Sequence, residues 1–201
     1  MRREYHETQE RLITATDALL DELPADEITV PRILERAGAA RSSLYYFFED
    51  LNDLLEEAYL RRFAAITEDT IRALTVAIGE STTSDELFAR LDAITRLSQA
   101  QGNRDRRIER ARMIARVQNN DRFRRRIGEL QASLTSQIAE LVAGAQERGL
   151  VTKAVSALGV ATFVQAYAFG RLLDDVSSEP MPDEDWVATV GHVVRRAFAP
   201  G

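Results

Sequence analysis

Arginine, serine and tyrosine side chains gather on one side of a short predicted helix near residue 45. They are Arg41, Ser42, Ser43, Tyr45 and Tyr46, and the opposite side carries Leu44 and Phe48, four residues apart. Arginine can pair bidentately with the edge of guanine, whereas serine accepts many partners and carries little sequence information. The spacing therefore predicts a helix with one buried apolar side and one polar side available for recognition.

A second short helix with its own boundary signals precedes this one. Thr29 is placed to cap it through its hydroxyl, and Pro31 lies in the first turn, where a missing N–H costs little. Gly38 ends the helix, because glycine enters the left-handed conformation without a Cβ penalty. Its apolar face is Val30, Ile33, Leu34 and Ala37. Two short helices around a glycine turn predict a helix-turn-helix, although an ordinary corner of an all-α protein has the same spacing.

The stretch from Thr8 to Leu55 resembles the DNA-binding domain of the TetR family of transcriptional regulators. The matching segments are ERLITATDALL, TVPRILERAG and ARSSLYYFF, of which the last is the most specific. The resemblance implies an all-α protein of about nine helices, with an N-terminal three-helix helix-turn-helix DNA-binding head on a larger helical ligand-binding and dimerisation body. We expect the head to cover residues 1–52 and the body residues 53–201.

The resemblance also implies which residues contact a double-stranded DNA operator. Arg41, Ser42 and Ser43 would face base edges in the major groove, and Tyr45 and Tyr46 would contact the DNA backbone. Thr29 and Arg32 would hold phosphates at the start of the second helix.

Three departures from the family pattern lie in or beside this surface. Ala40 stands where the family usually has a serine or threonine that caps the recognition helix, and Leu51 aligns with a lysine that touches phosphate. Glu49 and Asp50 precede Leu51 and would repel DNA if they faced it. These residues predict weaker DNA binding or an unusual operator geometry.

The charge distribution leads to the same expectation. The chain has a formal net charge of −6, and residues 1–60 hold 14 acidic residues against 6 arginines. Between Thr29 and Phe48 the balance is instead +2. Because counterion release depends on the cations that reach phosphates, we expect modest, salt-sensitive DNA binding.

Apolar periodicity and breaker residues predict helices along the whole chain. Beyond the two short helices, the expected ranges are Thr8–Leu23, Leu51–Ile78, Asp85–Gln101, Arg104–Val117, Arg122–Arg148, Ala154–Val176 and Asp183–Phe198. Asp50 and Ser84 are the expected caps of the helices that follow them, and Gly149 is the expected stop after Arg148.

The last two predicted helices are apolar enough to form a homodimer interface. The residues assigned to it are Val160, Val164, Trp186, Val187, Val190 and Val194. Small residues such as Gly159 and Gly170 allow close helix approach. Two helices from each subunit would form a four-helix interface, and a dimer suits a pseudo-palindromic operator. The alternative is that both helices pack only within one subunit.

By family resemblance the body binds a small-molecule effector. The candidate lining residues are Phe63, Thr67, Phe88, Leu91, Met113, Val117, Leu134, Gln137, Phe163, Gln165 and Tyr167. A mostly apolar cavity with a few polar anchors suits such a ligand, but the same spacing describes a plain core.

An arginine-rich segment between Arg104 and Arg126 has a charge balance of +7. An anionic effector is one interpretation. A solvated surface patch, partly matched by acidic residues such as Glu56 and Glu57, is the other and is favoured.

Several classes of function lack sequence support. There is no cysteine, and the two histidines, His6 and His192, lie near opposite ends of the chain. No pattern typical of a di-iron bundle, a phosphate loop or a nucleophile elbow occurs, so we expect no enzyme, catalytic residue, metal or cofactor. The lack of cysteine, of a signal peptide and of a membrane span predicts a cytoplasmic protein. The favoured hypothesis is a ligand-responsive, dimeric regulator, most simply a repressor. A dimeric ligand-binding protein that has lost DNA binding is the alternative.

Overall fold

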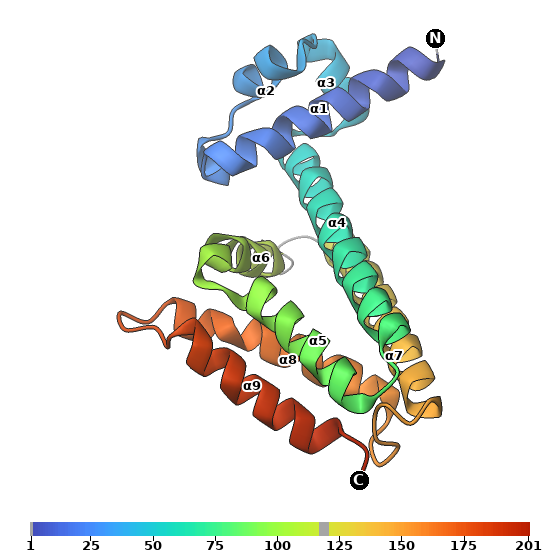
Figure 1. The fold of residues 1–201 in the computed structure, drawn as a ribbon. Helices are drawn as coiled ribbons and strands as arrows, with labels where there is room; N and C mark the ends of the chain where they lie inside the picture. Colours follow the sequence, from blue (N-terminus) through green and yellow to red (C-terminus); the bar gives the residue numbers. More distant parts are fainter. Residues whose placement is uncertain (1, 117–120) are drawn as a thin grey trace. The chain divides into compact units, whose positions relative to one another are not determined.

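The computed structural model describes residues 2–116 and 121–201, which form nine α-helices and two short 3-10 helices (Figure 1). The described residues contain no strand. The all-α architecture predicted from the sequence is thereby confirmed. The chain divides into two compact units, Met1–Ile66 and Thr67–Gly201.

The N-terminal unit consists of α1 (Arg2–Glu22), α2 (Val30–Ala37), α3 (Arg41–Phe47) and the first part of α4 (Leu51–Glu80). Helix α1 packs against both α2 and α3. The side chains buried in this unit come from all four helices and include Leu12, Leu19, Ile33, Leu44 and Leu54. This core fixes α2 and α3 on α1, so that their outer sides are left for contact with a partner.

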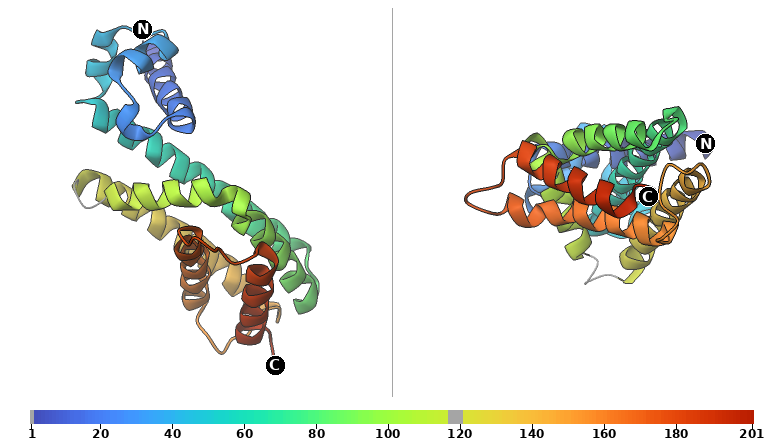
Figure 2. Two further views of the ribbon diagram at one scale, coloured as in Figure 1. Left: turned by 90° about the vertical axis from the view of Figure 1, so that its left-hand side faces the viewer. Right: turned by 60° about the horizontal axis from the view of Figure 1, so that its bottom comes forward.

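The C-terminal unit contains the rest of α4 together with α5 (Ser84–Gln99), α6 (Arg104–Arg116), α7 (Asp121–Glu147), α8 (Ala157–Asp175) and α9 (Asp183–Phe198). Helix α7 packs on α8, α5 packs on α9, and α6 packs on α8. Helix α9 runs alongside α5 and α8, as the two views show (Figures 1 and 2). One apolar cluster from α4, α5, α7, α8 and α9 forms the core of this unit, and it includes Leu74, Phe88, Leu134, Val160 and Val190.

The predicted helix ranges agree with the structure apart from their ends. The range Asp183–Phe198 is confirmed for α9, whereas α1 starts earlier than predicted, at Arg2. Helix α8 starts later than predicted, because the Ser156 side chain accepts a hydrogen bond from the Gly159 N–H and caps it there. Val117, the predicted end of α6, lies outside the described residues.

The predicted stop signals and caps have different outcomes. Gly38 and Gly149 adopt positive φ, of 58° and 73°, at the ends of α2 and α7, as expected for glycine at these sites. The Asp50 carboxylate accepts a hydrogen bond from the Asp53 N–H at 2.9 Å and caps α4. The prediction of Ser84 as the cap of α5 is wrong. Thr83 is the cap, and the Ser84 hydroxyl donates to the Leu150 carbonyl.

The expected domain boundary after residue 52 differs from the division between the compact units, which falls inside α4 after Ile66. The physical reason lies in the first turns of α4. Arg62 forms ion pairs with Asp17 and Asp21 of α1, so this part of the long helix belongs with the N-terminal unit. In the described part of the chain, no helix is long and apolar enough to cross a bilayer.

Candidate functional site

The turn between α2 and α3 is a Schellman motif. Gly38 donates its N–H to the Glu35 carbonyl at 3.3 Å, and Ala39 donates to the Leu34 carbonyl at 3.1 Å. Helix α3 then begins at Arg41, with Ala40 as its N-cap and no side-chain hydrogen bond at that cap. The turn itself is therefore held by backbone hydrogen bonds, and the buried Leu44 packs α3 into the core of the unit.

The two sides of α3 are as different as its sequence predicts. Leu44 and Phe48 are buried, whereas Arg41, Ser42, Tyr45 and Tyr46 are exposed and Ser43 is half-buried. Thr29 and Arg32 of the α2 start are exposed as well. All seven predicted DNA-contact residues therefore belong to one short helix-turn-helix and keep surface for a partner. Their contact with DNA stays a prediction.

The hydroxyl of Thr29 does not cap α2, contrary to the sequence-based expectation. Thr29 occupies the N-cap position, but its side chain makes no capping hydrogen bond. A hydroxyl at a helix start that makes no capping hydrogen bond can donate to a phosphate oxygen. The backbone N–H groups of the first helical turn also favour binding of an anion there.

The arginines of the helix-turn-helix have unequal partners. Arg36 donates to both carboxylate oxygens of Glu22, at 2.7 and 2.9 Å, which fixes it against the end of α1. Arg32 makes a 3.3 Å contact to the Glu27 carbonyl, and the Arg41 guanidinium lies 5.7 Å from the centre of the Tyr45 ring. In the contacts described here, Arg32 and Arg41 of each chain are not paired with a carboxylate.

The acidic residues of α1 are largely matched within the N-terminal unit. Arg62 of α4 contacts Asp17 and also donates to Asp21 at 2.8 Å, while Arg61 donates to Glu10 at 3.1 Å. These ion pairs reduce the repulsion that a net negative unit would exert on DNA. Asp50 and Asp53 are engaged as well, because the Asp53 carboxylate accepts the Glu49 N–H at 3.1 Å.

The predicted ligand-binding residues do not form one group. Phe88 and Leu134 belong to the apolar core of the C-terminal unit, and Leu91 and Tyr167 pack against it. Phe63 is buried in the N-terminal unit, whereas Thr67 and Met113 are buried in the C-terminal unit. Val117 lies outside the described residues. For Phe88 and Leu134, packing is an adequate explanation of their burial.

The polar members of the set occupy different surroundings. Gln137 is exposed and donates to Ser133 of its own helix, so it does not point into the core. Gln165 accepts from Gln131 at 2.6 Å and donates to Thr135 at 3.1 Å, which links α8 to α7. The Tyr167 hydroxyl lies 3.4 Å from the Thr95 hydroxyl, and burial raises the pKa of this phenol.

Phe163 is a half-exposed aromatic residue in contact with other rings. The centroid of its ring lies 5.5 Å from that of the Phe198 ring and 6.0 Å from that of the Tyr167 ring.

An open cleft of about 530 Å³ lies between α5 and α9, and none of the predicted ligand residues lines it. Its lining residues are Asp92, Arg96, Glu184, Val187, Ala188, Gly191, His192 and Arg195.

Most of the residues predicted for the dimer interface are buried in the core of their own unit. Val160, Val187, Val190 and Val194 are no more than 8% exposed and belong to the core of their own unit, against which Val164 and Trp186 also pack. This burial favours the alternative, that these side chains pack within one subunit, and their place in a dimer stays a prediction. Helix α8 is apolar around much of its circumference and α9 has one broad apolar stripe, so the sequence pattern alone did not show which apolar residues face the core.

The outer side of α8 carries an apolar stripe that the sequence analysis missed. Leu158, Phe169, Leu173 and Val176 are 57%, 38%, 80% and 68% exposed. They recur along one side of the helix together with the exposed Thr162 and Ala166, and Val193 of α9 is exposed too. The alternation of three- and four-residue steps from Leu158 to Val176 was the available signal.

The arginine-rich segment contains at least one structural residue. Arg107 forms a nearly buried ion pair with Asp175 of α8, so this guanidinium is not available to an effector. Burial lowers the pKa of the Arg110 guanidinium. Neither residue is part of an exposed patch, although Arg106 and Arg112 of the same helix are exposed.

Comparisons with known proteins agree with this geometry. Residues 12–58 match the model of the bacterial regulatory proteins, tetR family. No curated protein matches the chain. The fold resembles that of a TetR transcription regulator from Haloarcula marismortui, with 19% identity, a TM-score of 0.70, and coverage of 96% of this chain and 99% of that one.

Two further solved structures are similar over nearly their whole length. Reduced E. coli NemR is 17% identical, with a TM-score of 0.69 and coverage of 98% of this chain and 100% of the other. A transcriptional regulator from Saccharomonospora viridis, in complex with choline, is 17% identical, with a TM-score of 0.72 and the same coverage. The family model thus matches the helix-turn-helix of this chain, and the solved structures share the all-helical fold of the whole chain.

Proposed function

We propose that this protein is a ligand-responsive repressor that binds a pseudo-palindromic operator as a homodimer and is released by a small molecule. The observation that supports it most is the outer side of α3, where Arg41, Ser42, Tyr45 and Tyr46 are exposed on a helix whose other side is buried. A helix of this kind fits the major groove.

Each side chain has a role that its chemistry supports. Arg41 donates to base edges, with guanine as its best partner, and Ser42 and Ser43 add contacts of low specificity. Tyr45 and Tyr46 bind the DNA backbone, and Thr29 and Arg32 bind phosphates at the start of α2. Because Arg36 is committed to Glu22, the affinity is modest; it is sensitive to salt because Arg32 binds phosphate.

The dimer forms through the outer side of α8, with Val193 of α9 beside it, and not through the residues predicted from sequence. A monomer rarely leaves side chains such as Leu173 and Val176 largely exposed along one stripe. The same stripe on a second copy is self-complementary under two-fold symmetry. A dimer of this kind presents two α3 helices to two half-sites.

The effector binds in the C-terminal unit and changes the spacing of the two α3 helices, so that they no longer match successive major grooves. The choline complex of the similar Saccharomonospora viridis protein supports a small-molecule effector in this fold. Among the predicted lining residues, Leu91, Met113, Gln165 and Tyr167 are the candidates that combine apolar surface with polar anchors.

Footprinting on the DNA upstream of the gene tests the proposal, followed by a screen for molecules that release the protein. We expect protection of two half-sites and loss of protection with at least one small molecule. Absence of specific protection at every salt concentration would instead favour the alternative, a dimeric ligand-binding protein without DNA function. The acidic balance of residues 1–60 and Leu51 are the observations that favour that alternative.

A further inference from the structure

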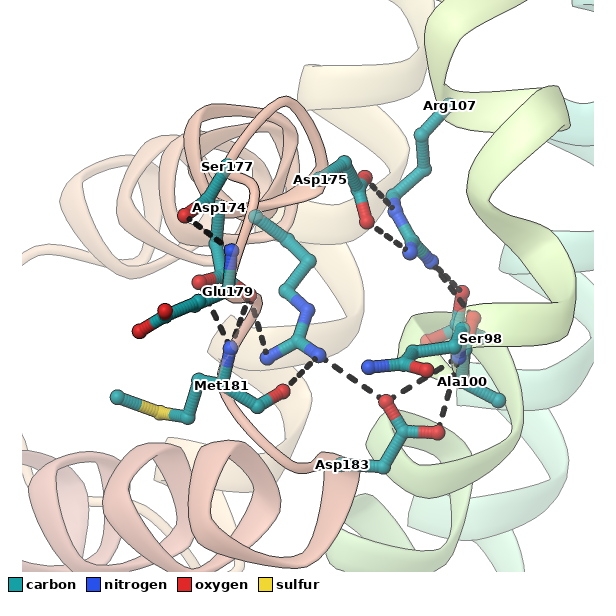
Figure 3. A network of polar contacts seen from close by, with 11 residues as sticks. Ser98, Ala100, Arg107, Asp174, Asp175, Ser177, Glu179, Met181 and Asp183 are labelled. Atoms are coloured by element: carbon teal, nitrogen blue, oxygen red, sulfur yellow. Dashed lines mark hydrogen bonds and ion pairs between the residues drawn. The ribbon is translucent and has the colours of Figure 1, made fainter.

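A cluster of two arginines and three aspartates lies where the ends of α8 and α5 meet the starts of α6 and α9 (Figure 3). We refer to Arg107, Arg171, Asp174, Asp175 and Asp183 as the α8 joint. All five lie in the C-terminal unit. None belongs to the predicted DNA-contact, ligand or dimer residues.

Arg107 fastens the start of α6 to the last residue of α8. Its Nε and Nη2 atoms donate to the two carboxylate oxygens of Asp175 at 2.5 and 2.6 Å, and its Nη1 donates to the Ala100 carbonyl at 3.0 Å. The Arg107 and Asp175 side chains are only 10% and 2% exposed. A bidentate pair of this kind fixes distance and orientation together.

Arg171 fastens α8 to the loop that follows it and to the start of α9. It is fully buried, and its Nη2 donates to the Met181 carbonyl at 2.9 Å and to Asp183 at 3.0 Å. Its guanidinium lies 5.0 Å from the centre of the Trp186 ring. The loop is held from its other side as well, because the Asp174 carboxylate accepts the Met181 N–H at 2.9 Å.

Asp183 joins these contacts to the connection between α5 and α6. Its carboxylate accepts the Gln101 N–H at 2.9 and 3.1 Å while it also receives Arg171. The starts of α6 and α9 and the end of α8 are therefore fixed by a single set of charged hydrogen bonds. Buried networks of this kind are better determinants of geometry than of stability, because each partner is costly to leave unpaired.

The last turn of α8 has charged residues of the joint on one side and exposed apolar residues on the other. Arg171, Asp174 and Asp175 make the joint, whereas Leu173 and Val176, which lie between and beside them in sequence, are largely exposed. Met181, whose backbone the joint holds, is exposed as well. The joint thus sets the position of the most exposed apolar side chains of the α8 stripe.

We propose that Arg107, Arg171, Asp175 and Asp183 are positioning residues for self-association, which present the end of α8 and residues 176–182 to a second copy of this chain. The same contacts fasten the start of α6 to the end of α8. The inference rests on the proposed dimer through the outer side of α8, and it adds the residues that set the geometry of that interface.

The test compares Arg107→Met and the milder Arg107→Lys with Arg90→Met in the full-length chain. Arg90 pairs with Glu80 at 2.7 Å on the surface of the same unit, so it is a control for loss of an ion-paired arginine outside the joint, and the hydrogen exchange described below controls for the greater burial of Arg107. Dimer dissociation constants come from analytical ultracentrifugation. We expect Arg107→Met to raise the constant by about tenfold or more and Arg107→Lys to have an intermediate effect. Arg90→Met should change it by less than about twofold.

Hydrogen exchange separates positioning from a general loss of stability. In the background of Leu173→Asp, which removes self-association, Arg107→Met should speed exchange in residues 172–182 more than in α7. If Arg107→Met does not fold, Asp183→Asn provides the same comparison, because Asp183 is the most accessible acid that Arg171 contacts directly.

Two results would overturn the proposal. One is an equal dimer dissociation constant for Arg107→Met, Arg107→Lys and Arg90→Met; the other is exchange that rises evenly over the C-terminal unit. A different result, wild-type dimerisation of Leu173→Asp itself, would contradict the proposed α8 interface and remove the basis of this inference with it. Loss of DNA binding alone would bear on the proposed function and not on the joint.

Discussion

The outer side of α3 and the outer side of α8 are both exposed, but they are suited to different partners. On α3 the exposed groups are a guanidinium, hydroxyls and phenol rings, and only Leu44 and Phe48 are buried beneath them. On α8 the exposed groups are Leu158, Phe169, Leu173 and Val176. Hydrogen-bond donors are solvated without a partner, whereas an exposed apolar stripe is typical of a surface that packs against another apolar surface. The difference is the basis for proposing DNA as the partner of the α3 side and a second copy of the chain as the partner of the α8 side.

The largest effect should come from a charge in the α8 stripe. Leu173→Asp places a carboxylate on the most exposed residue of the proposed dimer face, in the last turn of α8, and should weaken the dimer by about 30-fold or more, a loss of about 2 kcal/mol. Leu97→Asp is the matched control, because Leu97 is equally exposed on α5 and lies outside the stripe. Sedimentation of both variants decides the matter. An equal effect of the two substitutions would mean that exposure alone, and not an interface, explains the stripe.

The next effect concerns the α3 side. Arg41→Ala should weaken operator binding by about tenfold or more, because a bidentate arginine–guanine contact contributes about 1–3 kcal/mol. Arg72→Ala removes the same charge from an exposed arginine of the C-terminal unit, which pairs with Asp69, and should leave binding nearly unchanged. Fluorescence anisotropy with labelled operator DNA measures both. Equal affinities for the two variants would show that Arg41 makes no base contact.

A smaller effect should follow from releasing Arg36. Glu22→Ala removes the carboxylate that holds this arginine on the end of α1, and the freed guanidinium should strengthen DNA binding at low salt by about threefold. The double variant Glu22→Ala with Arg36→Ala should lose this gain. If Glu22→Ala binds DNA no better than the unaltered protein, the ion pair does not limit the affinity.

The smallest effect concerns the cap of α5. Hydrogen bonds from the Thr82 backbone and side chain lower the pKa of Glu86 below 4.5. A lowered pKa means that this carboxylate stabilises the fold above about pH 4.5, and that the stabilisation is lost as the pH falls through the lowered value. Glu86→Ala should therefore reduce Tm slightly at pH 7 and have no effect once Glu86 is protonated. A difference in Tm that persists unchanged at low pH would contradict this assignment.

The same comparison shows what the sequence was able to predict. The helix-turn-helix depends on local signals, so Gly38, Leu44 and the start of α3 at Arg41 were predicted correctly. The bounds predicted for α9, Asp183 and Phe198, are those of the structure. Local hydrogen-bond competition was harder to foresee, since Thr83 caps α5 while the neighbouring Ser84 reaches Leu150 across the fold.

Contacts between residues far apart in the sequence could not be predicted from local sequence signals. Arg107 and Asp175 are 68 residues apart, and nothing in their local sequence indicates that they meet. The valines of α8 and α9 were assigned to the dimer because α8 is apolar around much of its circumference and α9 carries a broad apolar stripe, and periodicity alone does not indicate what covers an apolar side. Only the tertiary packing of α9 against α5 and of α7 against α8 shows that these valines face the core of their own unit.

The most direct test of the central claim is the salt dependence of binding to the protected upstream DNA. Because Arg32 of each subunit is proposed to meet a phosphate and Arg41 a base edge, a plot of log K against log salt concentration should have a slope of about −2 per dimer from Arg32. Arg32→Ala should make that slope shallower by about 2 per dimer, whereas Arg41→Ala should lower the affinity and leave the slope nearly unchanged. No specific binding at any salt concentration, or a slope that Arg32→Ala leaves unchanged, would contradict the account.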